Sequence, residues 1–123
     1  MYIVDNDTTV NELKDLVKRF CEEKNWDQFH NPKDLAIGII TEAGELLDIF
    51  RFKREDEITQ MMINPEKRTA IGEELADVLY FVLRFAQMNN FDLSDELERK
   101  IEKNNERYPV KKSRNSNKKY NEI

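Results

Sequence analysis

The fold is decided by the stretch Glu66-KRTAIGEELADVLYFVLRFAQ-Met88, which carries apolar side chains at intervals of three and four residues. This spacing is typical of one face of an α-helix. Asn64-Pro65 closes the segment before the stretch, and Asn89-Asn90 ends the expected helix. We therefore expect a long helix over residues 66–88. Its apolar stripe comprises Ile71, Leu75, Val78, Leu79, Val82 and Ala86.

Three further helices are expected from capping signals and apolar periodicity. Residues 25–30 break the period and form a connector, and residues 53–65 are charged and predict a short amphipathic turn. The expected helices are residues 9–24, opened by Thr9 and Glu12, residues 32–52, opened by Asn31-Pro32, and a last helix from Asp92 or Ser94 to Pro109. The residues expected to face inward are Val10, Leu13, Leu16, Val17, Phe20, Cys21, Leu35, Ile39, Ala43, Leu46, Phe50, Leu93, Leu97 and Ile101.

The length and composition favour a single all-α domain. A chain of 123 residues suits one domain, and only three glycines and three prolines disfavour an all-β fold. Neither of the common glycine-rich phosphate-loop motifs is present. We expect a bundle of about four helices over residues 1–110, followed by a flexible basic tail over residues 111–123 that has no apolar period.

Cysteine and histidine usage excludes several kinds of site. The single cysteine, Cys21, excludes a disulfide framework and a cysteine-rich zinc site, and it is expected to be an inert core thiol. The single histidine, His30, excludes a multi-histidine metal centre. No apolar run reaches the roughly 18 residues that a membrane span needs, and the N-terminus lacks the features of a signal peptide. We expect a soluble protein of the cytoplasm.

The charge is unevenly distributed along the chain. Residues 1–98 carry 11 basic and 22 acidic side chains, a net charge of −11, whereas residues 99–123 carry 9 basic and 3 acidic side chains, a net charge of +6. An acidic body argues against binding of a nucleic-acid polymer, which depends on neutralising phosphates. An acidic pocket facing a basic tail suits a small anion held through metal ions, although a tail can also be merely solvated.

Two pairs of carboxylates lie beside the apolar stripes of successive helices: Glu42 with Glu45, and Glu74 with Asp77. Residues three apart on a helix project in the same direction. If the two helices pack face to face, four carboxylates converge, which is costly unless a cation neutralises them. Oxygen ligands without histidine fit Mg²⁺ or Mn²⁺. The alternative is a surface on which these carboxylates form salt bridges with Arg51, Lys53, Arg68 or Arg84.

Aromatic residues give a second indication. Phe52 lies at the end of one acidic helix, and Phe81 follows Asp77 by one turn. An aromatic slot beside a metal cluster can stack a nucleobase. For Trp26, Phe29, Phe52 and Phe81 the alternative is a plain core role, and for His30 it is a cap or core-edge role.

Five segments together resemble the MazG-like all-α nucleoside triphosphate pyrophosphatases, and within them the dCTP pyrophosphatase branch. They run in order from about Phe20 to Glu122. The segments are Asn25-WDQFHNP-Lys33, EAGELLDIF (Glu42–Phe50), EELADVLYF (Glu73–Phe81), KNNERYP (Lys103–Pro109) and KKYNE (Lys118–Glu122).

The resemblance implies hydrolysis between the α and β phosphates of a nucleoside triphosphate, with Mg²⁺ held by Glu42, Glu45, Glu74 and Asp77. It implies a dimer or tetramer with the pocket near a subunit interface. Trp26 and Phe52 would line the base pocket, and Phe52 stands where the family commonly has tryptophan. Positions associated with phosphate binding are Asn104, Tyr108, Lys119 and Tyr120.

The main hypothesis is therefore a Mg²⁺-dependent pyrophosphohydrolase that cleaves dCTP or a related dNTP to a monophosphate and pyrophosphate. Glu42 or Glu45 is a candidate to accept the proton of the attacking water, and the sequence does not choose between them. His30, Phe81 and the family positions above complete the expected substrate site. Two alternatives stay open: a non-catalytic helical interaction module, and a nucleotide sensor without turnover.

Overall fold

The computed structural model describes residues 2–122, apart from the side chain of Tyr120. Within these residues it is helical and contains no strand. The chain divides into two units, residues 2–90 and residues 91–122, which are described separately. The all-α prediction is confirmed, with six α-helices in the described part of the chain rather than about four.

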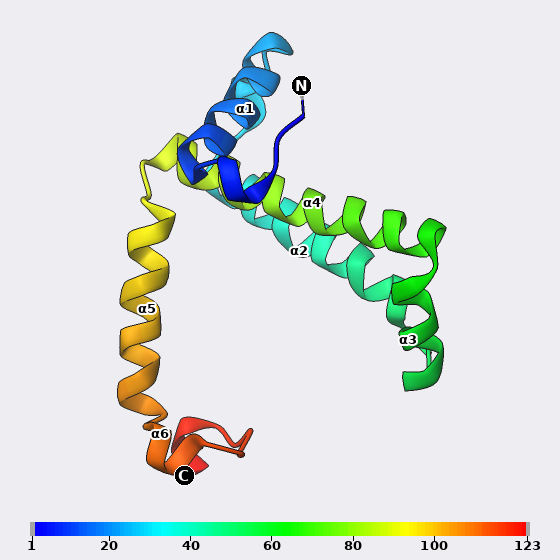
Figure 1. The fold of residues 1–123 in the computed structure, drawn as a ribbon. Coiled ribbons are helices and arrows are strands. Elements are labelled where there is room, and N and C mark those ends of the chain that lie inside the picture. The colour runs from blue at the N-terminus through cyan, green and yellow to red at the C-terminus, as the bar shows by residue number, and fades with distance from the viewer. Residues whose placement is uncertain (1, 123) are drawn as a thin grey trace. The chain divides into compact units, whose positions relative to one another are not determined.

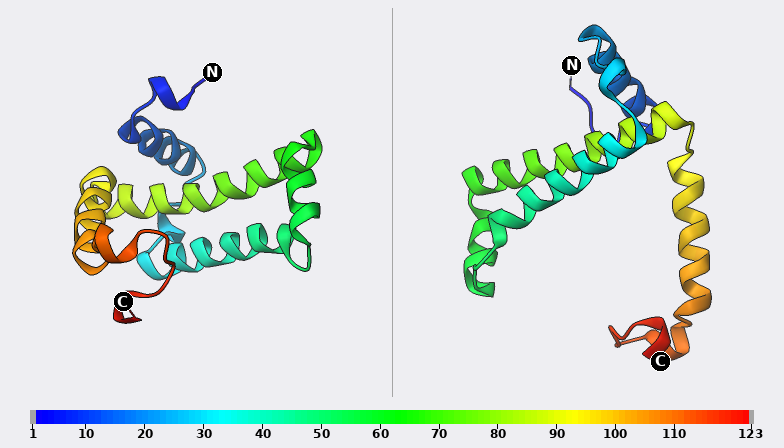
Figure 2. Two further views of the ribbon diagram at one scale, coloured as in Figure 1. Left: turned by 60° about the horizontal axis from the view of Figure 1, so that its bottom comes forward. Right: turned by 180° about the vertical axis from the view of Figure 1, so that it is seen from behind.

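The first unit is built on a pair of long helices. In chain order its elements are the 3₁₀ turn Asp5–Asp7, α1 (Val10–Glu23), the 3₁₀ turn Asp27–Phe29, α2 (Pro32–Phe50), α3 (Glu55–Ile63) and α4 (Pro65–Asn89). Helices α2 and α4 run side by side in opposite directions, joined at one end by α3, and α1 packs on α4 (Figures 1 and 2).

Local capping explains where these helices begin and end. The Thr9 hydroxyl accepts a hydrogen bond from the Glu12 N–H at 3.1 Å, and the Glu12 carboxylate accepts one from the Thr9 N–H. Asn31 and Asn64 cap α2 and α4, each with proline at the first helical position. Helix α4 ends at Asn90, which adopts the left-handed conformation (φ 58°) that asparagine tolerates better than most residues.

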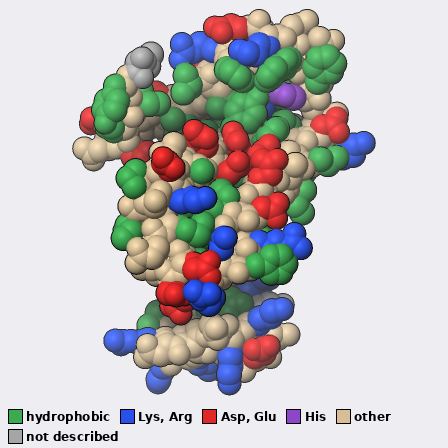
Figure 3. Space-filling view, turned by 90° about the vertical axis from the view of Figure 1, so that its right-hand side faces the viewer, with side chains coloured by type: hydrophobic (Ala, Val, Ile, Leu, Met, Phe, Trp, Pro, Cys, Tyr) green, Lys and Arg blue, Asp and Glu red, His purple; other side chains and the backbone are tan. Residues whose placement is uncertain are grey.

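The core of the first unit is small. Its buried side chains are Val17, Cys21, Leu35, Ile71, Leu83, Arg84 and Ala86. Several residues that periodicity predicts to face inward are exposed instead, and green apolar side chains are visible on the surface in Figure 3. Part of the apolar surface of α2 and α4 is therefore not covered by the other helices of this unit. The predicted inward residues that are exposed in this unit are Val10, Leu16, Phe20, Ala43, Leu75 and Leu79.

The second unit consists of α5 (Leu93–Arg107), the one-turn helix α6 (Val110–Ser113) and the 3₁₀ turn Tyr120–Glu122. Asp92 caps α5 by accepting a hydrogen bond from the Asp95 N–H. The prediction that Leu97 and Ile101 face inward is wrong for a single copy, since they are 62% and 50% exposed. Helix α6 begins where the sequence predicted the tail to begin, so part of the tail is helical. The division into residues 1–110 and 111–123 stays a prediction.

Candidate functional site

Three carboxylates from α2 and α4 converge in the first unit. Glu42, Glu45 and Glu74 each offer an oxygen atom, and these three atoms lie within 4.8 Å of one another. Glu42 and Glu45 are one turn apart on α2, and Glu74 faces them from α4 because the two helices pack side by side. Asp77, the fourth predicted ligand, follows Glu74 by one turn, and its charge acts on both Glu42 and Glu74.

The cluster holds more negative charge than its surroundings compensate. The Oε2 atoms of Glu42 and Glu74 are buried without a hydrogen-bond partner. Burial raises the pKa of both residues above the ordinary value, and the neighbouring carboxylates of Glu45 and Asp77 raise it further. The cluster therefore favours proton uptake, and a cation would relieve the same repulsion.

Salt bridging does not account for these carboxylates. Across residues 2–122, no ion pair involves Glu42, Glu45, Glu74 or Asp77. The basic residues that were considered as partners point elsewhere. Arg51 pairs with Asp48 at 3.7 Å, Arg68 donates to the Met62 carbonyl at 3.2 Å, and Arg84 pairs with Asp27.

The donor set fits a hard divalent cation. All candidate ligands are carboxylate oxygens, two of which are buried and unpartnered, and Mg²⁺ and Mn²⁺ prefer such oxygens. The cluster is thus suited to hold a divalent metal.

The connector before α2 brings Trp26 and His30 together. Their ring centroids lie 6.4 Å apart with the edge of one ring toward the other, and Trp26 also meets Phe20 edge-on at 5.6 Å. Trp26 is exposed and His30 is half-buried, so both can reach a ligand. Arg84 of α4 binds this connector, because its Nε donates a hydrogen bond to Nδ1 of His30 at 2.9 Å.

Phe81 occupies the crossing of α2 and α4. Its ring lies so close to Gly38 that a Cβ atom at Gly38 would come within 2.5 Å of it, and it meets Tyr80 edge-on at 4.9 Å. This contact gives the half-buried Phe81 a packing role. A direct role in stacking a base stays a prediction.

Phe52 lies at the opposite end of α2 from Trp26. It adopts a left-handed conformation (φ 64°) and is 88% exposed, with the Arg51 guanidinium 4.8 Å from its ring centroid. Helix α2, which is about 28 Å long at 1.5 Å per residue, has Trp26 before its first residue and Phe52 after its last. A nucleobase is far smaller than this helix is long, so we do not expect one base to touch both aromatic residues of the same copy.

The remaining predicted substrate residues belong to the second unit. Asn104 lies in the last turn of α5 and Tyr108 ends this helix, where the Tyr108 N–H donates to the Asn104 carbonyl at 2.7 Å. Lys119 lies just before the last 3₁₀ turn, and its N–H donates to the Glu122 carboxylate at 3.3 Å. The side chain of Tyr120 lies outside the described residues.

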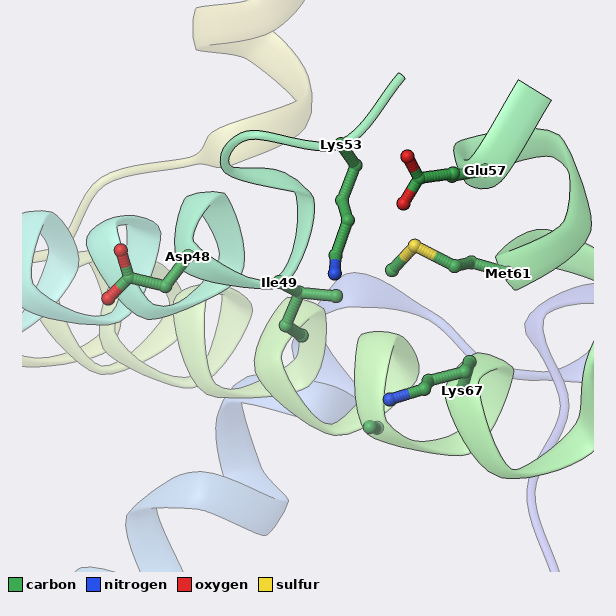
Figure 4. A pocket seen from close by; sticks show the side chains of 7 residues that line it. Asp48, Ile49, Lys53, Glu57, Met61 and Lys67 are labelled. Carbon is green, nitrogen blue, oxygen red and sulfur yellow. The ribbon is translucent and has the colours of Figure 1, made fainter. Parts of the chain in front are cut away.

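A pocket of about 380 Å³ opens where α2, α3 and α4 meet (Figure 4). Ile49 follows Glu45 by one turn, and Ala70 precedes Glu74 by one turn, so the pocket lies one turn along these two helices from the carboxylates. Lys53 and Lys67 extend into it and form no ion pair within residues 2–122. The other lining residues are Asp48, Glu57 and Met61.

Sequence reasoning missed Arg84. It was considered only as a surface partner for carboxylates, yet it is buried, with 1% of its surface exposed, and it binds the connector. The available signal was its position among the apolar residues of α4, between Leu83 and Phe85. Cys21 is buried as expected, and its Sγ lies 3.1 Å from the Tyr80 hydroxyl.

None of the helices that the structure describes combines the length and the apolar character needed to cross a membrane.

Comparisons with known proteins agree with this arrangement. The sequence pattern of the MazG-like family matches residues 37–123. The chain is 35% identical to mouse dCTP pyrophosphatase 1 over 94% of its length and 68% of that protein, and 34% identical to the human protein named dCTP pyrophosphatase 1 over 115 residues. A crystal structure of a pyrophosphatase from Archaeoglobus fulgidus superposes with a TM-score of 0.76 at 32% identity, covering 88% of this chain and 99% of that one. The predicted family is confirmed: this chain, with its paired acidic helices, belongs to the MazG-like family.

Proposed function

We propose that this protein is a nucleoside triphosphate pyrophosphohydrolase that acts on dCTP or a closely related dNTP. The observation that carries the proposal is the convergence of Glu42, Glu45 and Glu74, with two buried oxygens that no protein group satisfies. The names of the relatives, dCTP pyrophosphatase 1, support the substrate and the bond cleaved. The site of action is proposed to be the cytoplasm.

The carboxylates would hold Mg²⁺, with Glu42, Glu45, Glu74 and Asp77 as its ligands. A bound divalent cation neutralises charge on phosphate oxygens and lowers the pKa of an attacking water. Glu42 or Glu45 would accept the proton of that water. Water attack at phosphorus then breaks the bond between the α and β phosphates and releases a monophosphate and pyrophosphate.

The base site would be shared by two copies of the chain. Trp26 and His30 precede α2 and Phe52 follows it, and α2 is about 28 Å long, so a pocket that uses both ends needs a second copy in the opposite direction. Exposed apolar residues on α2 and α4 supply a surface for this pairing, which would form a dimer or tetramer. These exposed residues include Ile37, Ile40, Leu47, Leu75 and Leu79.

The tail would supply the remaining phosphate contacts. Lys119 and Tyr120 lie in a segment rich in basic residues, and Asn104 and Tyr108 end the preceding helix. Lysine and tyrosine donors suit the phosphate oxygens that the metal leaves uncompensated. Phe81 completes the proposed site from the α2–α4 crossing.

Product analysis tests this function directly. The protein is incubated with dCTP and Mg²⁺, and the products are separated by ion-exchange chromatography. We expect dCMP and pyrophosphate in equal amounts, with no product when EDTA replaces Mg²⁺. Release of orthophosphate would refute the assigned bond. Binding of dCTP without any product would identify a sensor instead of an enzyme.

A further inference from the structure

All three nitrogens of the Arg84 guanidinium are engaged by different partners. Nε donates to Nδ1 of His30 at 2.9 Å, Nη1 donates to Oε1 of Gln87 at 2.6 Å, and Nη2 donates to the carboxylate of Asp27. Only 1% of the Arg84 side chain is exposed, so this charge is buried among groups that satisfy it. Because the orientation of the guanidinium is fixed, it also restricts the orientation of the three side chains that it contacts.

The contact with His30 determines which ring nitrogen carries the proton. An arginine side chain has donors and no acceptor, and it keeps its charge at all ordinary pH values. The imidazole nitrogen that faces Nε must therefore present a lone pair. Nδ1 is that nitrogen, so the proton of the neutral ring sits on Nε2.

The surroundings also keep His30 neutral. Burial lowers the pKa of His30 below its ordinary value, and the charge of Arg84 lowers it further, while the carboxylate of Asp27 opposes this. A second proton would have to occupy Nδ1, directly against the guanidinium. His30 is thus held as a neutral donor and does not act as an acid or a base near neutral pH.

We propose that Arg84 is a positioning residue that fixes His30 with its Nε2–H as a permanent donor to an acceptor atom of the nucleobase. His30 lies beside the exposed Trp26, with their ring centroids 6.4 Å apart, so the rim of a base stacked on Trp26 would lie close to the imidazole ring. The matching acceptor is a ring carbonyl or a bare ring nitrogen, such as those of a pyrimidine. This inference rests on the proposed function, because it assigns specificity to the same site.

The protonation state is measurable without a nucleotide. His30 is the only histidine of the chain, so ¹⁵N NMR correlation spectra of the labelled full-length protein contain one set of ring signals. At neutral pH we expect a protonated Nε2 and an unprotonated Nδ1. A proton on Nδ1, or a doubly protonated ring, would overturn the proposal even if the protein hydrolyses dCTP.

The donor role is tested by adding a dCTP analogue with an imido bridge between the α and β phosphates, together with Mg²⁺. We expect the Nε2–H resonance to shift and its exchange with water to slow. An unchanged resonance at saturating analogue would refute contact with the base. Failure of the proposed function would appear separately, as absence of turnover while the tautomer is as expected.

Variants separate positioning from simple structural support. Arg84→Met should let both tautomers form and raise KM for dCTP about threefold to tenfold, the effect of one neutral hydrogen bond, with little change in kcat. The matched control is Asp27→Asn, which breaks the ion pair but keeps the donor to His30 and should keep the tautomer. Arg84→Lys supplies a second, charge-conserving variant in case the methionine variant does not fold. Equal increases in KM for the methionine and Asp27→Asn variants, with the tautomer unchanged in both, would contradict the proposal.

Discussion

The Oε2 atoms of Glu42 and Glu74 are buried and have no hydrogen-bond partner. A buried carboxylate oxygen without a donor costs free energy unless a proton or a cation reaches it. Natural proteins rarely keep such atoms without a use. Their presence where the two acidic pairs meet indicates a site that takes up a proton or a cation.

Removing one carboxylate should separate function from stability. Glu45→Ala or Asp77→Ala is expected to abolish turnover of dCTP and to leave the metal-free protein as stable as before, or more stable, because like charges no longer repel. Thermal melts with and without Mg²⁺ measure this. For the unchanged protein, Mg²⁺ at 100 times its Kd adds about 2.7 kcal/mol to the free energy of unfolding, and both variants should lose most of that gain. A strongly destabilised Asp77→Ala protein that still turns over would identify a structural role.

The pH dependence of stability follows from the direction of the pKa shifts. Glu42 and Glu74 have a higher pKa in the folded protein than in the unfolded chain, so the folded state binds more protons. Their stabilising contribution is complete below the ordinary glutamate pKa, and it is lost as the pH rises through the raised values. The metal-free protein should therefore lose this contribution toward neutral pH, whereas stabilisation by Mg²⁺ should grow, because the ion competes with those protons. Melting curves at a series of pH values, with and without Mg²⁺, measure both trends. A Mg²⁺ effect independent of pH would contradict this cluster as the metal site.

At the scale of elements, the packing of α2 on α4 depends on the absence of a side chain at Gly38. A Cβ atom there would lie 2.5 Å from the Phe81 ring, which is closer than real contacts allow. Gly38→Ala should therefore lower the free energy of unfolding by about 1–3 kcal/mol, as overpacking does. Gly72→Ala is the matched control, since nothing lies within 4 Å of its Cβ position, and helix propensity predicts a gain of about 0.5–1 kcal/mol. Chemical denaturation measures both, and a stabilised Gly38→Ala protein would refute the close crossing.

The helices themselves could be predicted because their ends carry local signals. Thr9 and Asn31 cap the helices that the sequence assigned to them, and Asp92 caps α5 as one of the two residues expected there, since capping acts over a few residues. Helix α3 was expected only as a short amphipathic turn, because its nine residues are mostly charged or polar and show little apolar period. Local signals therefore give the four longer helices α1, α2, α4 and α5, but not α3 or α6.

The tertiary contacts could be predicted only in part. The spacing of Glu42 with Glu45 and the position of Glu74 were sufficient to predict their convergence, because helix periodicity fixes which face they share. The exposure of Leu75, Leu79 and Leu97 could not be predicted, since periodicity identifies an apolar face without saying what covers it. The role of Arg84 depends on a contact with His30, 54 positions away in the chain, which no local pattern reveals.

At the scale of the whole molecule, the distance between Trp26 and Phe52 makes the assembly part of the proposed site. Trp26→Ala and Phe52→Ala should each weaken nucleotide binding by about 1–3 kcal/mol, the usual value of one base stack. If two copies share each site, mixing the two variants in equal amounts should restore about a quarter of the sites, because half of the dimers are mixed and each has one intact site. Assays at dCTP concentrations below KM, after co-refolding, measure the recovery. If the mixture is no more active than the separate variants, both residues lie on one copy or outside the pocket.

The C-terminal segment should affect the substrate more than the helices. Truncation after Val110 removes Lys119 and Tyr120 while leaving α1 to α5 in place. We expect KM for dCTP to rise, with helical content and the stabilisation by Mg²⁺ unchanged, because the segment contributes charge and few apolar contacts. Steady-state kinetics and circular dichroism measure these effects. Equal kinetics for the truncated and full-length proteins would indicate a merely solubilising tail.

Trp26, which lies edge-on beside His30, is an intrinsic fluorescence probe of the proposed base site. Trp26 is the only tryptophan in the chain, so all of the indole fluorescence comes from this one position. A base that stacks on the exposed indole should quench that emission as it binds, whereas bond cleavage follows more slowly. Stopped-flow traces would then resolve arrival of the nucleotide, its hydrolysis and departure of the products as successive phases, without a dye attached to either molecule.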